Sequence, residues 1–153
     1  MRPISRRRFL FASAWAASRG RASRASETAS ADCGWPSHGY DLRQTRFNDR
    51  ETRLGREDVG RLRLRWQFSA GGGFTGTPAV AGGRVIVGCW DGNVYALDRR
   101  SGRLLWKFRV GTRRYPGDRS IGIYASPAVS GSTVYVASDR LLALSVADGR
   151  RLW

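Results

Sequence analysis

Two stretches of this chain repeat each other, and this repetition limits the folds open to it more than any other feature. Thr77-Pro78-Ala79-Val80 recurs as Ser126-Pro127-Ala128-Val129, 49 residues later, and Leu105-Trp106 recurs as Leu152-Trp153, 47 residues later. Apolar segments and turn residues follow one another in the same order in both copies. A repeat of this length indicates one supersecondary unit that is used twice.

Each copy predicts four short antiparallel strands separated by turns rich in Gly, Asn and Asp. In the first copy we expect the strands at 77–80, 84–88, 94–98 and 104–110. Four strands in a period of about 40–50 residues are typical of a propeller blade. The sequence therefore predicts an all-β fold, a partial β-propeller, with a first blade over 77–110 and a second, truncated blade over 111–153.

Residues 32–76 are expected to form a lead-in segment that ends in a lone outer strand. Arginine and apolar residues alternate over 61–68 with the period of two that is typical of a half-exposed strand. Trp66 near its end aligns with Trp106 and Trp153. The three tryptophans are thus predicted to end three successive outer strands.

The first 31 residues differ in composition from the rest. Arg6-Arg7-Arg8-Phe9-Leu10 opens a short apolar stretch that ends at Ala17, and Ala29-Ser30-Ala31 has the pattern of a cleavage site. The segment resembles a twin-arginine export signal, which predicts a periplasmic or secreted protein. The alternative is a disordered basic tail.

The large positive net charge is weak evidence for a polyanionic partner. The chain has 27 Lys+Arg against 12 Asp+Glu, a formal net charge of +15, but all of these cations except Lys107 are arginine. The arginines are scattered among acids, and no recognised nucleic-acid motif accompanies them. Nucleic acid is therefore not the favoured partner. No apolar run reaches the ~18 residues of a membrane-spanning helix.

The segment Ala96-x-Asp98-x-x-Ser101-Gly102-x-x-x-Trp106 resembles the tryptophan-docking motif of the quinoprotein dehydrogenases, which are pyrroloquinoline quinone (PQQ) β-propellers. The second copy, 143–153, matches with Ser145 in place of the aspartate. The resemblance implies that each tryptophan packs between neighbouring blades and that each glycine makes the turn before the outer strand. The residues of this expected docking motif are Ala96, Asp98, Gly102, Trp106, Ala143, Gly149 and Trp153.

The lead-in segment resembles the same family, through Trp35-Pro36-x-His38-Gly39 and the glycine-rich run Gly71-Gly72-Gly73-Phe74. Members similar to polyvinyl alcohol dehydrogenase share most with it. The resemblance covers residues 35–153 and implies a propeller of about eight blades. It thus implies that this chain is an N-terminal fragment, inactive alone and dependent on the remaining blades.

The resemblance also implies what this part of the chain lacks. In the family, PQQ and a calcium ion lie on the propeller axis and an aspartate acts as general base, all held by later blades. Many members carry adjacent cysteines where this chain has Asp118-Arg119-Ser120-Ile121, and alcohol dehydrogenases carry a glutamate where it has Phe74-Thr75. We therefore predict no catalytic residue and no metal ligand here. The cofactor-binding residues are unknown, and PQQ and calcium are expected only in an intact parent enzyme.

Three residues with reactive side chains have simpler readings. His38, the single histidine, is expected to be a packing or surface residue of the lead-in segment. Cys33 and Cys89 either form a bridge in an oxidising compartment or are unrelated thiols, with Cys89 buried in a strand. Asp32 directly before Cys33 argues against a lipid anchor at that cysteine.

Two functions remain open for the intact parent. The first is an exported PQQ-dependent dehydrogenase that oxidises a small alcohol, a polyol or a polymer. The second is a non-catalytic PQQ-like propeller that binds other proteins, such as the outer-membrane assembly lipoprotein. The missing cysteine pair favours the scaffold, and the missing lipid-anchor pattern argues against that example of it. A nucleic-acid binder rests on charge alone.

Overall fold

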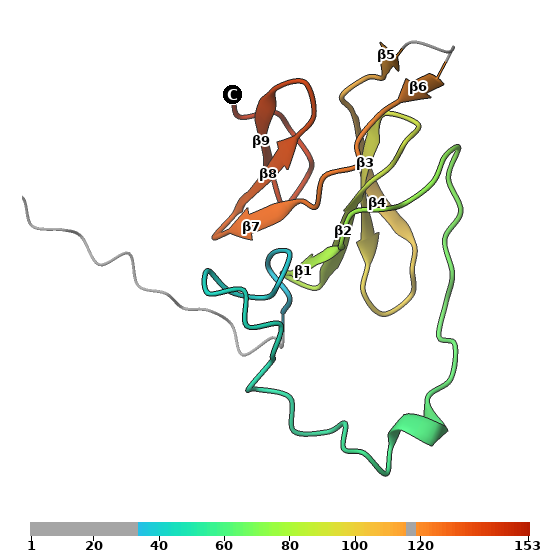
Figure 1. The fold of residues 1–153 in the computed structure, drawn as a ribbon, viewed down its shortest axis with the longest axis vertical. Helices are drawn as coiled ribbons and strands as arrows, with labels where there is room; N and C mark the ends of the chain where they lie inside the picture. Colours follow the sequence, from blue (N-terminus) through green and yellow to red (C-terminus); the bar gives the residue numbers. More distant parts are fainter. Residues whose placement is uncertain (1–33, 116–118) are drawn as a thin grey trace, which may run out of the picture.

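The computed structural model describes residues 34–115 and 119–153, and these residues form antiparallel sheets. The first sheet has four strands in the order β1-β2-β3-β4 (Figure 1). Its strands are β1 (Ala79–Ala81), β2 (Arg84–Gly88), β3 (Asn93–Asp98) and β4 (Leu104–Arg109). The expected all-β fold of a partial propeller is confirmed, while the expected export signal lies outside the described residues.

The second sheet repeats the first with one strand fewer. Its three strands follow the order β7-β8-β9 and are β7 (Ala128–Ser130), β8 (Thr133–Ala137) and β9 (Leu141–Ser145). Beside β9 the chain begins a fourth strand, because Arg151 forms an isolated bridge with Leu144 and the Leu152 N–H donates to the Ala143 carbonyl at 2.8 Å. The two sheets are therefore built on one plan.

A two-stranded hairpin that the sequence did not predict connects the two sheets along the chain. It pairs β5 (Arg113–Tyr115) with β6 (Arg119–Ile121). Its segment carries arginines rather than alternating apolar residues, so it lacks the pattern that identifies a half-buried strand. The hairpin projects beyond the ends of the sheets (Figure 1).

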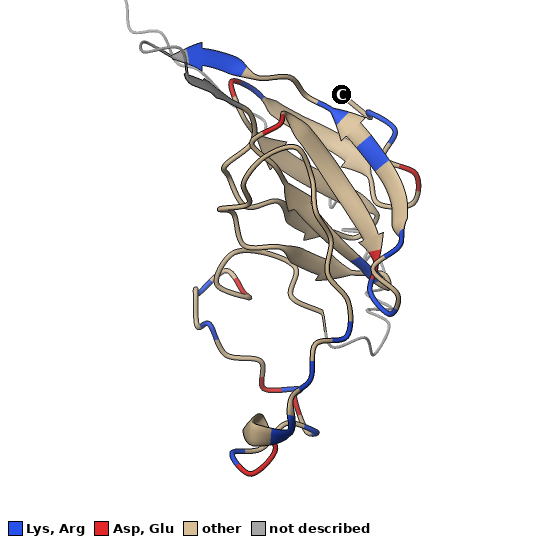
Figure 2. Ribbon diagram, turned by 90° about the vertical axis from the view of Figure 1, so that its right-hand side faces the viewer, with Lys and Arg blue, Asp and Glu red and all other residues tan. Residues whose placement is uncertain are grey.

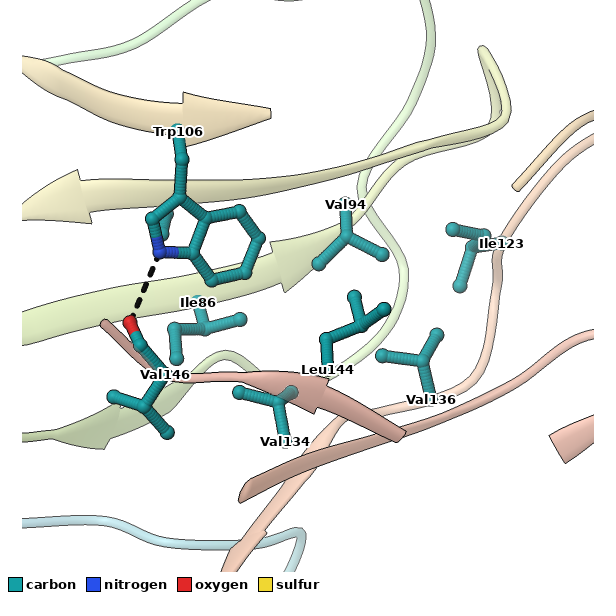
Figure 3. Packing of buried hydrophobic residues seen from close by; sticks show 9 residues of the cluster. Ile86, Val94, Trp106, Ile123, Val134, Val136, Leu144 and Val146 are labelled. Atoms are coloured by element: carbon teal, nitrogen blue, oxygen red, sulfur yellow. Dashed lines mark hydrogen bonds between the residues drawn. The ribbon is translucent and has the colours of Figure 1, made fainter. Parts of the chain in front are cut away.

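The main core lies between the two sheets, which pack face to face. Both sheets and the connection between them supply its buried side chains (Figure 3): Ile86, Val94, Ala96, Trp106, Ile123, Val134, Val136, Leu144 and Val146. Burying one side chain of this size contributes about 1.5–3 kcal/mol. Neither sheet alone would cover these side chains, so the contact between the sheets stabilises both of them.

The start of the lead-in segment ties the two sheets together at their edge strands. Trp35 and Val80 exchange backbone hydrogen bonds, with N···O distances of 2.9 and 2.7 Å. The next carbonyl, that of Pro36, accepts a hydrogen bond from the N–H of Val129 in β7 at 2.8 Å. The segment thus lies across β1 and β7 together (Figure 1).

The predicted lone strand over 61–68 is not formed. Val59–Arg61 is a turn of 3-10 helix, and the residues from 62 to 70 belong to no strand. Leu64 is 80% exposed. A strand requires a neighbour that accepts and donates ladder hydrogen bonds, and the described residues place none beside this segment. In the part of the chain that the structure describes, no helix is long and apolar enough to cross a membrane.

Candidate functional site: the seam between the sheets

Trp106 crosses from the first sheet to the second. It lies in β4, its side chain is 8% exposed, and its Nε1–H donates to the carbonyl of Val146 at 3.0 Å (Figure 3). A buried indole N–H requires a partner, since an unpaired buried donor costs about 1–3 kcal/mol. The residue therefore combines a large apolar contact with one directional bond between the sheets.

Gly149 lies directly against the indole of Trp106. Its φ is +73°, and a Cβ built on it would lie 2.5 Å from Cε3 of the ring. Its N–H donates to the Ser145 carbonyl at 2.9 Å, which closes the turn after β9. Only glycine fits both requirements, because a side chain would be strained by the positive φ and would collide with the ring.

The same geometry occurs one repeat earlier. The Nε1–H of Trp66 donates to the carbonyl of Arg99 at 3.0 Å. Gly102 has a φ of +71°, and a Cβ on it would lie 2.5 Å from Cδ2 of Trp66. Its N–H donates to the Asp98 carbonyl at 2.8 Å. Although Trp66 belongs to no strand, its indole occupies the position that Trp106 occupies in the next seam.

A carboxylate holds each of the two turns. In the first turn Asp98 accepts hydrogen bonds from the N–H and the hydroxyl of Ser101, at 2.8 and 2.7 Å. Hydrogen bonds from Ser101 are the main reason that the pKa of Asp98 lies below its usual value. In the second turn Ser145 replaces Asp98, and the hydrogen bond from its side chain is the main reason that the pKa of Asp148 is lowered. The serine and the aspartate thus occupy opposite positions in the two turns.

The remaining predicted residues of the motif have unlike surroundings. Ala96 and Ala143 are fully buried, and Ala96 lies opposite Trp106 in the ladder. Trp153 is 56% exposed, and its ring has Tyr135 as a neighbour at a centroid distance of 6.3 Å. The structure therefore brings Trp106 together with Gly149, and Gly102 with Trp66. Among the described residues, Trp153 has no such glycine.

A second polar cluster, which the sequence reading missed, lies at the hairpin between β2 and β3. The Asp91 carboxylate accepts hydrogen bonds from the Tyr95 hydroxyl at 2.5 Å, from the Asn93 N–H at 3.0 Å and from the Gly71 N–H at 3.2 Å. Beside it, the indole of Trp90 donates to Thr75 at 2.9 Å. These bonds fasten the glycine-rich loop over the hairpin. An aspartate two residues before a polar strand start was the available signal.

Burial and the neighbouring carboxylate shift the ionisation of this cluster. Desolvation, followed by the hydrogen bond to Asp91, raises the pKa of Tyr95 to about 12. For Asp91 desolvation raises the pKa, but hydrogen bonds led by that of Tyr95 outweigh it, so the pKa lies below the usual value. Asp91 is thus an anion at neutral pH that is already bound by three donors.

The described residues do not fit a calcium site. Among residues 34–115 and 119–153, no group of three His, Cys, Asp or Glu side chains could hold a metal ion. The Asp91 oxygens accept internal hydrogen bonds, and the position before the first repeat holds Phe74, whose side chain has no oxygen, and Thr75, whose hydroxyl accepts a hydrogen bond from Trp90. No step of a PQQ reaction is therefore derived from this part of the chain.

The structure places His38 at the surface and Cys89 in the interior. The Nδ1 of His38 is 2.9 Å from the hydroxyl of Thr77, at an exposed position. Cys89 is a free, fully buried thiol, and burial raises its pKa. The expected burial of Cys89 is confirmed, but the residue directly follows β2 and lies in no strand. Cys33 lies outside the described residues, so a bridge between the two cysteines stays a prediction.

Two sheets on one plan, stacked face to face with an indole across the seam, define a protein built from propeller blades. A family model described as outer membrane protein assembly factor BamB, built on the PQQ repeat, matches residues 60–153. The chain belongs to this family of PQQ-type β-propeller repeat proteins.

Relatives fall into two groups. The chain is 39% identical over 83 residues to the outer membrane protein assembly factor BamB of Pseudomonas aeruginosa, and the alignment covers 52% of this chain and 22% of the relative. The chain is 30% identical over 125 residues to the 1-butanol dehydrogenase (cytochrome c) of Thauera butanivorans, and this alignment covers 78% of this chain and 18% of the relative.

Solved structures include a similar fold. The crystal structure of quinohemoprotein alcohol dehydrogenase from Comamonas testosteroni matches with a TM-score of 0.65 and 27% identity, over 83% of this chain and 20% of that chain. The chain spans about a fifth of the length of these relatives.

Proposed function

We propose that this chain supplies the lead-in segment and two blades of a PQQ-dependent dehydrogenase that oxidises an alcohol or a polyol. The similarity of the lead-in segment to a dehydrogenase is the observation that supports this proposal. The alignment with the butanol dehydrogenase, over 125 residues, is longer than the stretch from 60 to 153 and so includes part of that segment. The alignment with the assembly factor covers 83 residues.

Within such a protein the contribution of the described residues is architectural. The pair Trp66–Gly102 holds the lead-in segment against the first blade, and the pair Trp106–Gly149 holds the first blade against the second. Apolar side chains that remain exposed, such as Leu64 and Trp153, supply contact area for further blades. PQQ supplies the oxidation chemistry when bound, and residues outside the described part hold it and its calcium ion.

A second candidate, a protein-binding scaffold, is favoured by the residues at 118–121. Many dehydrogenases carry two adjacent cysteines at this place in the chain, and this chain has none there. A propeller that keeps its blade seams and lacks a cofactor site would bind other proteins through its surfaces.

The enzyme and the scaffold are distinguished on the complete reading frame that contains this chain. The purified product is incubated with PQQ and calcium and then mixed with an alcohol and an artificial electron acceptor. Alcohol-dependent reduction that requires PQQ supports the dehydrogenase, and the same protein without PQQ is the control. A folded product that binds no PQQ and reduces no acceptor overturns the dehydrogenase in favour of the scaffold.

We further propose that the protein is exported to the periplasm or secreted. Arg6 and Arg7 support this proposal, because a twin-arginine signal depends on the paired guanidinium groups. Replacing both with lysine is expected to leave the protein in the cytoplasm, as measured by cell fractionation. Replacing Arg21 and Arg24, which lie outside the motif, is the matched control. Unchanged export in the double-lysine variant overturns the proposal.

A further inference from the structure

A small hollow opens between the two sheets at the end of β4, away from the indole seam. Its volume is about 110 Å³. Three elements supply its walls: the end of β4, the start of β9 with the residue before it, and the segment that bridges to β9. The residues that line it are Phe108, Arg109, Val110, Arg140, Leu142 and Arg151.

The lining combines three arginines with three apolar residues. Phe108 and Val110 are half-buried and Leu142 is buried, whereas Arg109, Arg140 and Arg151 are exposed. Apolar side chains beside arginines reduce the number of water molecules that compete for a bound oxyanion.

The positive charge of the hollow is only partly balanced. The Arg140 guanidinium forms an ion pair with Asp139 at 3.3 Å, and hydrogen bonding from Arg140 holds the pKa of Asp139 below its usual value. In the described part of the chain, Arg109 and Arg151 form no ion pair within 4.0 Å. Three cations facing one carboxylate leave a local excess of positive charge. Lys and Arg recur on the sheets as well as in the long lead-in loop (Figure 2).

The size of the hollow limits its occupant to one small group. A hollow of about 110 Å³ has room for a few water molecules or one small anion. A tetrahedral phosphate or a carboxylate fits such a space, and the rest of a larger ligand would extend into solvent. Planar guanidinium forks match both groups through paired N–H···O bonds.

We propose that this hollow binds one oxyanion group of a small molecule, a phosphate or a carboxylate, between the two blades. The bound anion accepts hydrogen bonds from Arg109, Arg140 and Arg151 and relieves the repulsion among them. Because the three arginines come from both sheets, the anion also holds the sheets together. The site depends on neither PQQ nor the proposed dehydrogenase activity.

Calorimetric titration of the full chain with inorganic phosphate, and separately with acetate, tests the proposal at low ionic strength. Saturable binding of phosphate alone identifies a phosphoryl site, and binding of acetate identifies a carboxylate site. Binding is expected to weaken as salt is raised, since exposed charges are screened within about 10 Å at 0.1 M ionic strength. Binding of neither anion overturns the proposal.

The affinities of arginine variants for the anion test whether it binds in this hollow. Arg109→Gln and Arg140→Gln are each expected to weaken binding about tenfold, the loss of one charge-assisted hydrogen bond. Arg109→Lys keeps the charge and loses the planar fork, so it is expected to bind with intermediate affinity. Arg56→Gln, at an exposed position of the lead-in loop, is the control. Equal affinity in all four variants and the unchanged chain overturns the assignment, and circular dichroism checks that each variant is folded.

Discussion

The indole of Trp106 reaches the carbonyl of Val146, 40 residues further along the chain, and rests on Gly149 as it does so. One side chain thereby joins the two sheets through a buried surface and a hydrogen bond. The relationship between these residues makes the seam the part of the fold where substitutions are expected to have the largest effects.

Trp106→Phe is expected to lower the free energy of unfolding by about 2–4 kcal/mol. The smaller ring leaves unfilled space, and the buried carbonyl of Val146 loses its donor. Urea unfolding followed by circular dichroism measures the change. Trp153→Phe is the matched control, since that ring is 56% exposed, and its effect is expected to stay within about 0.5 kcal/mol. Equal effects of the two substitutions would contradict the importance of the seam.

Gly149→Ala is expected to destabilise the fold more than Gly83→Ala. Both glycines have nearly the same φ, +73° and +72°, so both substitutions carry the same backbone strain of about 1–2 kcal/mol. A Cβ on Gly83 would meet no atom within 4 Å, whereas one on Gly149 would collide with Trp106. The difference between the two unfolding free energies therefore measures the clash alone. No difference would mean that the indole moves aside without cost.

Asp91→Asn is expected to make stability less dependent on pH in the acid range. The folded-state pKa of Asp91 is lowered, so the carboxylate stabilises the fold at neutral pH, and this contribution is lost as the pH falls below about 4 and through the folded pKa. Unfolding measured between about pH 5 and 2 should show a shallower slope for the variant. Asp49→Asn, which removes a carboxylate at an exposed position, is the matched control.

Tyr95 is expected to ionise only at strongly alkaline pH. Its pKa of about 12 lies above the unfolded value near 10, so its contribution is complete below about pH 10 and is lost as the pH rises through 12. Alkaline titration of tyrosinate absorbance should show a step near pH 12. Tyr95→Phe should remove that step. A late step that survives in this variant belongs to a different residue.

The sequence predicted the strands of the first sheet closely because local signals mark both their faces and their ends. The expected 84–88 is β2, and 94–98 and 104–110 differ from β3 and β4 by one residue at an end. The expected 77–80 starts two residues before the start of β1 and ends one residue before its end. Alternation marks the strands, and Gly92 and Gly102 mark the turns with positive φ. The segment 61–68 carries the same alternation and forms no strand, since alternation selects a face and cannot supply a neighbour to pair with.

The side chains of the seam could be predicted from the sequence, whereas the backbone groups that bind them could not. The resemblance to the docking motif marked Trp106 and Gly149, and it did not show that the glycine of one copy receives the tryptophan of the copy before it. The acceptors of the indole bonds are the carbonyls of Arg99 and Val146. Every residue has a carbonyl, so no sequence pattern identifies these two. The contact of Gly71 with Asp91 likewise joins segments that no periodicity connects.

The seams also have a direction. Trp66 and Trp106 each reach toward the later sheet, and Gly102 and Gly149 each receive a ring from the earlier side. Such contacts are head-to-tail, with a different surface on each partner, and repeating one relates successive units by a constant rotation. Whether an array of these sheets closes into a ring or winds on as a spiral is therefore decided by the angle at a single seam. The pairing of one indole with one glycine helps to set that angle.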